Sequence, residues 1–204
     1  MATLQFFPTL IHRATLQRPS RTATLRERLL QECLQLRADD GAGRRWSKRN
    51  YPRGYTSYGS VSQMQRVSPT FAQLEGLIDR EVARFARKLD FDLQGRTLTM
   101  TDCWVNIMKR GAVHGLHLHP LSAVSGTYYV QTPAGAPGLK FEDPRLDRFM
   151  ASPPRRERGA ARPWVVLPAK PGEVLLFESW LRHEVMSQGA PGERISISFN
   201  YNWF

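Results

Sequence analysis

The sequence predicts an antiparallel β-jelly roll that is preceded and backed by helices. Apolar residues recur every three or four positions in the first half of the chain, whereas they alternate with a period of two from about residue 97. In the second half, short candidate strands are separated by turns rich in Pro and Gly. Many short strands at such spacing are typical of sandwiches, barrels and jelly rolls, so the predicted class is mainly β with N-terminal helices (α+β).

The first half is expected to provide an arm and two helices. Residues 3–16 mix β-forming residues around a proline, which indicates a short strand or arm. Thr24 and Glu27 form a capping box for a first helix. Ser68 and Pro69 form the start of a second helix, an N-cap residue followed by Pro at the first helical position. The apolar stripe of this second helix comprises Phe71, Leu74, Ile78, Val82, Phe85 and Leu89.

Between the two helices, residues 39–62 are rich in Gly, Arg, Ser and Tyr, and they predict a long irregular connection. The period-two half begins with one long strand, in which Leu98, Met100, Asp102, Trp104, Asn106 and Met108 share a face. Further strands are expected at 113–119, 123–131, 138–142, 163–168, 173–178, 182–187 and 194–203, with an insertion loop at 152–162. We therefore expect a single domain, with 1–96 as arm and helical support and 97–204 as the jelly-roll core.

The formal net charge of +11 raises the hypothesis of a nucleic-acid partner. Basic residues are scattered near the N-terminus and clustered at 44–49 and 155–156, within segments that look like loops. No RNP-type aromatic motif, zinc finger or basic heptad accompanies them. The pattern therefore favours a solvated surface, and an acidic or polyanionic partner is the alternative.

The location expected from the sequence is cytoplasmic. No apolar run approaches the roughly 20 residues that span a bilayer. The N-terminus has neither the charged start nor the long apolar middle of a signal peptide. Cys33 and Cys103 fit no disulfide framework or CxxC pair, which suits a reducing compartment.

Three histidines are spaced so that strands could gather them around one metal ion. His117 and His119 are two residues apart, so they project to one side of a strand, and Pro120 ends the pairing after them. His183 follows another strand-like run. Imidazoles with open coordination positions suit Fe(II), and also Zn, Cu or Ni. His114 is an odd number of residues from His117, so we expect it to face away and not to be a ligand.

A His-x-His pair alone is commonly a polar surface pair, so the metal hypothesis also depends on the last strand. Arg194, Ser196, Ser198 and Asn200 share one face there, opposite an apolar face. Buried polar groups need partners, and a guanidinium beside a hydroxyl suits a ligand carboxylate. A hairpin between residues 182 and 203 would return Arg194 close to His183 on a neighbouring strand. The sequence thus predicts a small dicarboxylate held beside the metal.

In this order the motifs resemble the 2-oxoglutarate/Fe(II) dioxygenases of the prolyl-hydroxylase type, and more closely a bacterial family of 2-oxoglutarate-Fe(II) oxygenases. The resemblance covers roughly residues 97–202, and more loosely 54–57. The matching stretches are Trp104-Val105-Asn106-Ile107, His117-Leu118-His119-Pro120, Ser125-Gly126-Thr127-Tyr128-Tyr129-Val130, Phe141-Glu142-Asp143-Pro144-Arg145, Phe177-Glu178-Ser179-Trp180-Leu181-Arg182-His183 and Arg194-Ile195-Ser196-Ile197-Ser198-Phe199-Asn200.

The resemblance implies a double-stranded β-helix with iron at the mouth of the barrel and His117 and His183 as metal ligands. It implies that Arg194, helped by Ser196, pairs with the distal carboxylate of 2-oxoglutarate. Tyr129 stands where related hydroxylases direct a tyrosine hydroxyl at the same carboxylate. Asn106 and Met108 are expected to line this cosubstrate pocket.

The chain departs from the family pattern at the third ligand. Most such enzymes have His-x-Asp or His-x-Glu, whereas this chain has His119. A three-histidine centre lacks a negative ligand, which changes the charge and redox behaviour of the metal. Asp143 is the nearest alternative carboxylate.

The implied activity uses Fe(II), 2-oxoglutarate and O2. It couples formation of succinate and CO2 to oxidation, in the first instance hydroxylation, of a second substrate, for which a protein, peptide or small molecule is favoured. One alternative is a nucleic-acid-directed oxygenase of the same chemistry. Another is a non-catalytic, cupin-like metal-binding protein, against which Arg194 argues, because a simple metal binder has no use for a carboxylate-binding fork.

Overall fold

The structure is a computed structural model, and it describes residues 2–4, 6–16, 24–151, 153–154 and 162–203. The helices are α1 (Leu25–Asp39), α2 (Gly41–Asn50), α3 (Met64–Val67), α4 (Pro69–Lys88) and a 3-10 helix (Leu146–Phe149). The strands are β1 (Ile11–Thr15), β2 (Gly54–Thr56), β3 (Leu98–Met108), β4 (His114–His117), β5 (Val124–Gln131), β6 (Leu139–Glu142), β7 (Trp164–Leu167), β8 (Glu173–Glu178), β9 (His183–Val185) and β10 (Arg194–Trp203).

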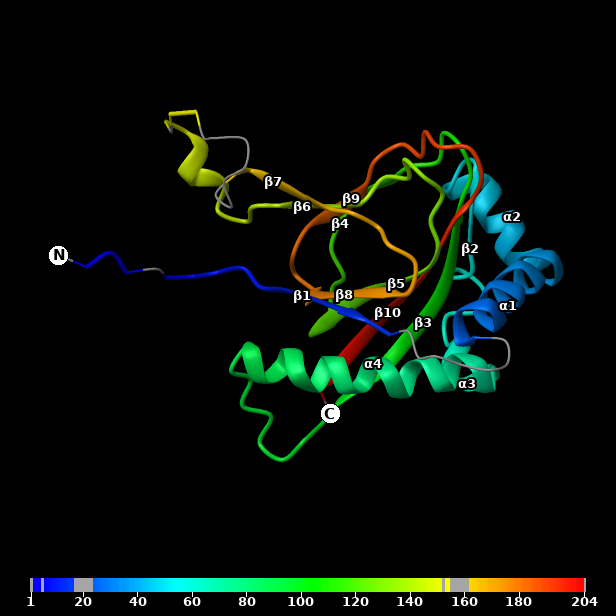
Figure 1. Cartoon of the computed structure of the whole chain (residues 1–204), viewed down its shortest axis with the longest axis horizontal. Coiled ribbons are helices and arrows are strands. Elements are labelled where there is room, and N and C mark those ends of the chain that lie inside the picture. Colours follow the sequence, from blue (N-terminus) through cyan, green and yellow to red (C-terminus); the bar gives the residue numbers. More distant parts are fainter. Residues whose placement is uncertain (1, 5, 17–23, 152, 155–161, 204) are drawn as a thin grey trace.

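The strands form two antiparallel sheets. The larger sheet has the order β1-β8-β5-β10-β3-β2, and the smaller has the order β4-β9-β6-β7. One apolar core lies between the sheets, where residues such as Tyr129 and Phe177 of the larger sheet pack with Phe141 of the smaller. A second core lies between the larger sheet and the helices, with α4 running across that sheet (Figure 1). Every strand segment expected in the second half is confirmed within a few residues.

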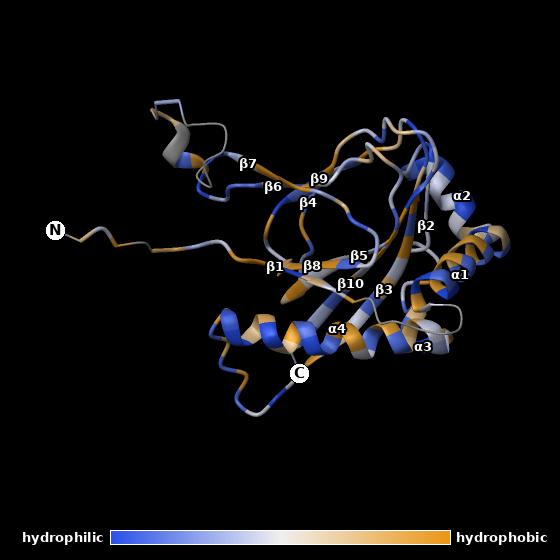
Figure 2. Cartoon of the chain, viewed as in Figure 1, coloured by the Kyte–Doolittle hydropathy of each residue, from blue (hydrophilic) through white to orange (hydrophobic). Residues whose placement is uncertain are grey.

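The two expected helices are confirmed. The capping box of α1 is complete, because Thr24 accepts from the backbone of Glu27 and the Glu27 side chain accepts from the backbone of Thr24. Ser68 caps α4 by accepting from the first backbone N–H groups of the helix. The apolar stripe of α4 is buried against the larger sheet, whereas its opposite face is hydrophilic (Figure 2).

The prediction of a long irregular connection over residues 39–62 is wrong, because the structure has α2 and β2 there. Gly-rich and strongly basic, the α2 segment has poor intrinsic helix propensity. It is held by long-range contacts that sequence periodicity does not show. Asp40 caps it through the backbone of Gly43, and the buried Ser47 hydroxyl accepts from the Thr56 amide of β2 at 3.0 Å.

The shared face expected for the long strand holds only for its second half. Asp102 pairs with Asn200 and Met100 with Tyr201, so Thr101 is an extra residue in β3. This β-bulge shifts the alternation of side chains by one position. Leu98 and Met100 consequently pack with the helices, whereas Asn106 and Met108 face the interior between the sheets.

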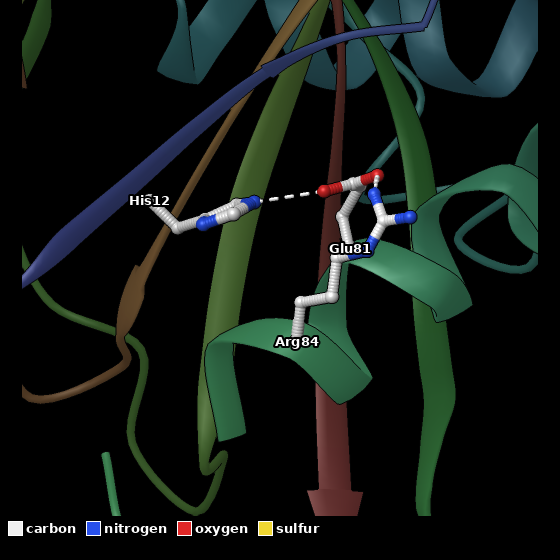
Figure 3. Close-up of polar contacts among 3 residues, drawn as sticks. All are labelled: His12, Glu81 and Arg84. Atoms are coloured by element: carbon white, nitrogen blue, oxygen red, sulfur yellow. Dashed lines mark hydrogen bonds and ion pairs between the residues drawn. The ribbon is translucent and has the colours of Figure 1, made fainter. Parts of the chain in front are cut away.

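The N-terminal arm enters the fold through β1, which pairs with β8 at the edge of the larger sheet. A buried carboxylate on α4 fastens it there. Glu81 accepts from His12 Nε2 of β1 at 2.9 Å and also pairs with Arg84 (Figure 3). The arm is thus tied to both the sheet and the helix that covers it.

Two further expectations concern the second half. The prediction that a hairpin would place Arg194 on a strand beside His183 is wrong, because β9 and β10 belong to different sheets. The expected loop at 152–162 falls largely outside the described residues, as do the basic residues at 155–156.

Among the described residues, no helix has the length and apolar character required to cross a membrane.

Candidate active site

His117, His119 and His183 lie together at one end of the space between the sheets. His117 ends β4 and pairs in register with His183, the first residue of β9. His119 follows β4, and its backbone N–H donates to the Ser179 carbonyl at 2.9 Å. One potential ligand atom from each histidine lies within 4.8 Å of those of the other two. The predicted trio is therefore brought together with a spacing that one metal ion could bridge.

Each of these imidazoles is held by its Nδ1 atom. Nδ1 of His117 lies 2.7 Å from the Gly115 carbonyl oxygen, and Nδ1 of His183 lies 2.9 Å from that of Leu181. Because a carbonyl oxygen only accepts, both Nδ1 atoms carry the proton and donate. His119 Nδ1 donates in the same way to Oδ1 of Asn200 at 2.5 Å. In this tautomer the Nε2 atoms keep their lone pairs, as metal ligands require.

Burial keeps the trio neutral. It lowers the pKa of His183 to about 3, and the neighbouring His117 lowers it further while the bond to Leu181 opposes the shift. Burial likewise lowers the pKa values of His117 and His119, against the opposing effect of their hydrogen-bond acceptors. Neutral imidazole is the form that binds a metal, so the three side chains need no deprotonation at neutral pH.

His114 does not face away from the site as expected. The β4–β9 register shifts between His114 and His117, which places both rings on the same side. The rings stack with centroids 4.4 Å apart and planes 8° from parallel. Burial, followed by the effects of His117 and Arg194, lowers the pKa of His114 to about 3. His114 lines the same pocket as His117, His119 and His183, but it is not part of the group of three histidines that could bind one metal ion.

Asp143, the alternative carboxylate, does not belong to that group either. Its two oxygens each lie 3.0 Å from a guanidinium nitrogen of Arg145, just beyond the end of β6. Its side chain therefore has a local ion-pairing partner.

Arg194 lies across the barrel, on the larger sheet, and lines the same inner pocket as the three histidines. The residue is only 2% exposed. Its guanidinium donates to the Pro137 carbonyl at 3.3 Å and to the Ser196 hydroxyl at 3.2 Å, and it contacts Met108 Sδ at 3.6 Å. Within the described part of the chain, no carboxylate forms an ion pair with it. A buried cation without a counter-ion is costly, so a carboxylate ligand fits this position.

Two more predicted residues present buried polar atoms beside Arg194. Tyr129 lies in the core with its ring centroid 5.2 Å from the Arg194 guanidinium carbon, and no hydrogen bond of normal geometry joins its hydroxyl to the described residues. Asn106 donates to the Ser198 hydroxyl at 3.0 Å, whereas its buried Oδ1 has no partner among the described residues. Unsatisfied buried polar atoms are uncommon and mark places where a ligand can bind.

The inner pocket is small and opens next to a larger cleft. It encloses about 30 Å³ between the histidines and Arg194, with Met108 against the guanidinium. The outer cleft has a volume of about 350 Å³, and its lining includes Trp46, Tyr58 and Trp104. A dicarboxylate entering the inner pocket therefore has to displace a flexible side chain, and Met108 is the one in contact with Arg194.

Some site residues were not recognised in the sequence. The sequence predicts the correct face for Asn200 but not its bond to His119. Its Oδ1 also accepts from the Ser125 hydroxyl at 2.9 Å, and its Nδ2 lies 3.4 Å from Oδ2 of Asp102. Tyr51, which lines both pockets, belongs to the segment expected to be irregular. The polar row on the last strand was the signal for Asn200, and none was available for Tyr51.

Comparison with known proteins agrees with this geometry. Residues 102–200 match the family model described as "Putative 2OG-Fe(II) oxygenase". That segment contains the three histidines, Tyr129, Arg194 and Asn200. No protein with a curated description matches the sequence.

Solved structures show the same fold. A prolyl-4-hydroxylase from Pseudomonas putida matches with a TM-score of 0.61 and 15% identity, over 96% of this chain and 94% of that one. A prolyl hydroxylase from Trichoplax adhaerens, in complex with a hypoxia inducible factor oxygen degradation domain peptide fragment, gives 0.61 and 16%, over 95% and 83%. HygX from Streptomyces hygroscopicus, with nickel, 2-oxoglutarate and hygromycin B bound, gives 0.60 and 17%, also over 95% and 83%.

The two facing sheets are accordingly those of a double-stranded β-helix, as the sequence predicted. The family match covers the strands that carry the histidines and Arg194. Residues 102–200, slightly less than half of the chain, are therefore similar in sequence to the 2OG-Fe(II) oxygenase family, and the chain as a whole has the fold of solved 2-oxoglutarate oxygenases.

Proposed function

We propose that His117, His119 and His183 hold Fe(II) in this chain and that Arg194 binds the distal carboxylate of 2-oxoglutarate beside it. The bound iron and cosubstrate would supply the oxidising chemistry, in which 2-oxoglutarate and O2 give succinate and CO2 while a second substrate is oxidised, in the first instance by hydroxylation. The remaining tasks, which are binding, orientation and exclusion of water, fall to the side chains of the chain itself.

One observation carries the proposal. Three neutral imidazoles with their Nδ1 atoms engaged lie in the same pocket as a buried guanidinium that forms no ion pair within the described residues. A metal site alone explains the imidazoles but not the cation, and a carboxylate site alone does not explain three buried histidines. A metal with a carboxylate-bearing chelator explains both.

The residues around Arg194 have separate tasks in this proposal. The guanidinium offers donors in a rigid fork that matches a carboxylate, and the Ser196 hydroxyl can donate to the same group. The hydroxyl of Tyr129, which forms no hydrogen bond of normal geometry with the described residues, is a further donor. Asn106 lines the same pocket as the histidines and Arg194. Met108 gives way when the ligand enters.

The outer cleft is the proposed entrance for the second substrate, because it adjoins the inner pocket through Asn106, His117 and His119. A cytoplasmic location is part of the same proposal. It is supported by Cys33 and Cys103, both of which are buried and free.

The test measures binding and turnover separately. Purified protein is stripped of metal, Fe(II) is restored without oxygen, and 2-oxoglutarate affinity is determined by calorimetry. Oxygen is then admitted and succinate is quantified with and without candidate substrates. Iron-dependent succinate formation supports the proposal. Metal binding without 2-oxoglutarate binding would instead favour a cupin-like metal-binding protein.

A further inference from the structure

Helix α2 arranges four basic residues in a way that the expected loop would not. Successive residues of a helix are rotated by about 100°. Ser47 faces the protein and is 2% exposed. Arg44 and Lys48 therefore occupy one flank of the helix, Arg45 and Arg49 its solvent-facing crest, and Trp46 and Asn50 the other flank. The four cations, Arg44, Arg45, Lys48 and Arg49, are exposed, and we call them the α2 basic band.

The first flank of α2 borders a cavity of about 250 Å³ that we call the basic pocket. Among the described residues, its lining includes five cationic side chains and no carboxylate: Arg37, Arg44, Lys48, Arg53 and Lys109. One of the five, Arg37, pairs with Glu193 at 2.6 Å. Asp39 and Asp40 lie at the N-terminal end of α2, where Asp40 is engaged with Gly43, Tyr55 and Ser60. Like charges gathered in this way favour an anionic partner.

The other flank of α2 borders the outer cleft. Trp46 is 38% exposed and Tyr58 is 53% exposed at this cleft. Tyr58 meets Trp104 edge to face at 5.0 Å, and Trp104 lies 5.8 Å from the His119 ring. Aromatic faces thus lead from the α2 helix to the three-histidine group. β2 links the two cavities, since Tyr55 lines the basic pocket and Thr56 lines the cleft.

We propose that α2 binds single-stranded nucleic acid, with phosphates along the basic pocket and the α2 basic band and a base in the aromatic outer cleft. Regularly spaced cations beside aromatic faces form the surface on which single strands bind, through phosphate contacts and base stacking. An acidic peptide would satisfy the cations but offers no repeated flat ring for Trp46 and Tyr58. The binding step stands by itself, and only the oxidation of the bound base rests on the proposed function.

The experiment uses the full chain, free of metal and 2-oxoglutarate, and a fluorescently labelled single-stranded oligonucleotide of mixed sequence. Affinity is measured by anisotropy between 50 and 200 mM salt. The double variant Arg45→Gln/Arg49→Gln should weaken binding about tenfold at low salt and reduce the log–log salt slope by about 1.4, for two lost phosphate contacts. Trp46→Ala should weaken binding roughly fivefold or more and leave the slope unchanged.

Two control variants accompany these measurements. Arg80→Gln/Arg87→Gln removes the same charge from exposed positions on α4 and should bind like the unmodified protein. Arg45→Lys/Arg49→Lys keeps the charge and should keep the salt slope. Absence of oligonucleotide binding, equal losses in the α4 control, or equally strong binding of polyglutamate of the same length would each overturn the proposal. Succinate formation without a second substrate should be unchanged in Arg45→Gln/Arg49→Gln, so a failure of the oxygenase assignment would be recognised separately.

Discussion

Asn200 of β10 accepts a 2.5 Å hydrogen bond from Nδ1 of His119, and this bond joins the larger sheet to the segment that follows β4 of the smaller one. The Ser125 hydroxyl donates to the same amide oxygen at 2.9 Å, which fixes the orientation of the amide. On the other side, Asn200 Nδ2 lies 3.4 Å from Asp102. Asn200 therefore holds the unusual third histidine in one tautomer and one ring orientation, with a carboxylate behind it.

Replacing Asn200 tests this positioning role. Asn200→Ala should weaken Fe(II) or Co(II) binding roughly 10- to 100-fold, because partners of metal ligands orient the ring and raise its basicity. Co(II) absorption should also change in band shape, which a merely structural defect would not cause. Asn202→Ala, on the same strand, is the matched control. Metal affinity and Co(II) spectra equal to those of the unmodified protein would show that the bond has no such role.

The third ligand itself is tested by two histidine variants. His119→Ala should lower metal affinity by at least tenfold, because it removes one of the three proposed ligand atoms. His114→Ala should leave metal affinity nearly unchanged, although His114 stacks on His117 at 4.4 Å. Metal-induced thermal stabilisation reports both affinities. A greater loss in His114→Ala than in His119→Ala would contradict the assignment.

Arg194→Ala should reduce 2-oxoglutarate affinity by about 30-fold or more, since truncating one partner of a buried charge pair costs roughly 2–5 kcal/mol. Arg194→Lys should not restore it, because an ammonium group cannot reproduce the planar fork. Calorimetric titration of the Fe(II)-loaded protein measures both. Arg182→Ala, at a largely exposed arginine, is the control. Unchanged affinity in Arg194→Ala would remove the main support for the cosubstrate site.

The arm contact offers a test remote from the site. Glu81→Gln should loosen β1 from α4, because the carboxylate that links His12 and Arg84 is lost (Figure 3). We expect a loss of about 1 kcal/mol in the free energy of unfolding and faster tryptic cleavage after Arg13 of β1. Glu75→Gln, earlier on the same helix, should not accelerate that cleavage. Equal cleavage rates would mean that strand pairing alone holds the arm.

The two free thiols should be inert in the folded protein. Cys33 and Cys103 are at most 1% exposed, and burial is the main cause that raises the pKa of each. A raised pKa means less thiolate at any given pH, so alkylation should begin at a higher pH than for a free cysteine. Iodoacetamide labelling followed by mass spectrometry should detect modification at pH 8 only after unfolding. Rapid labelling of the native chain would disprove this.

Local patterns were sufficient for much of the fold. The caps at Thr24 and Ser68 and the alternation in β10 depend on residues close in sequence, so they could be read directly. Helix α2 could not, because Ser47 gains its buried partner, Thr56, only when β2 has joined the sheet. Two β-bulges were also not predictable from the sequence, and each changed which face of its strand the side chains occupy. One moved Leu98 and Met100 to the helical side, and the other turned His114 toward His117.

In the candidate site, too, the residue types were predictable from the sequence, whereas the contacts between distant segments were not. Residue type and spacing predicted that the three histidines and Arg194 would form one site, and the structure places them in one pocket. How they meet was not predictable, because His183 and Arg194 approach from opposite sheets rather than from one hairpin. The partners of the histidines depend on distant segments in the same way.

β10 lies between β5 and β3 and carries Arg194, Ser196 and Asn200 on its inner face. A slip of one residue in its pairing would turn all three outward at once. A chain with this strand mispaired would therefore lose the proposed cosubstrate anchor and the support of the proposed third ligand together. Under the proposed site assignments, such a chain would be inactive rather than turn over 2-oxoglutarate without its substrate, so any activity depends on the correct pairing of this one strand.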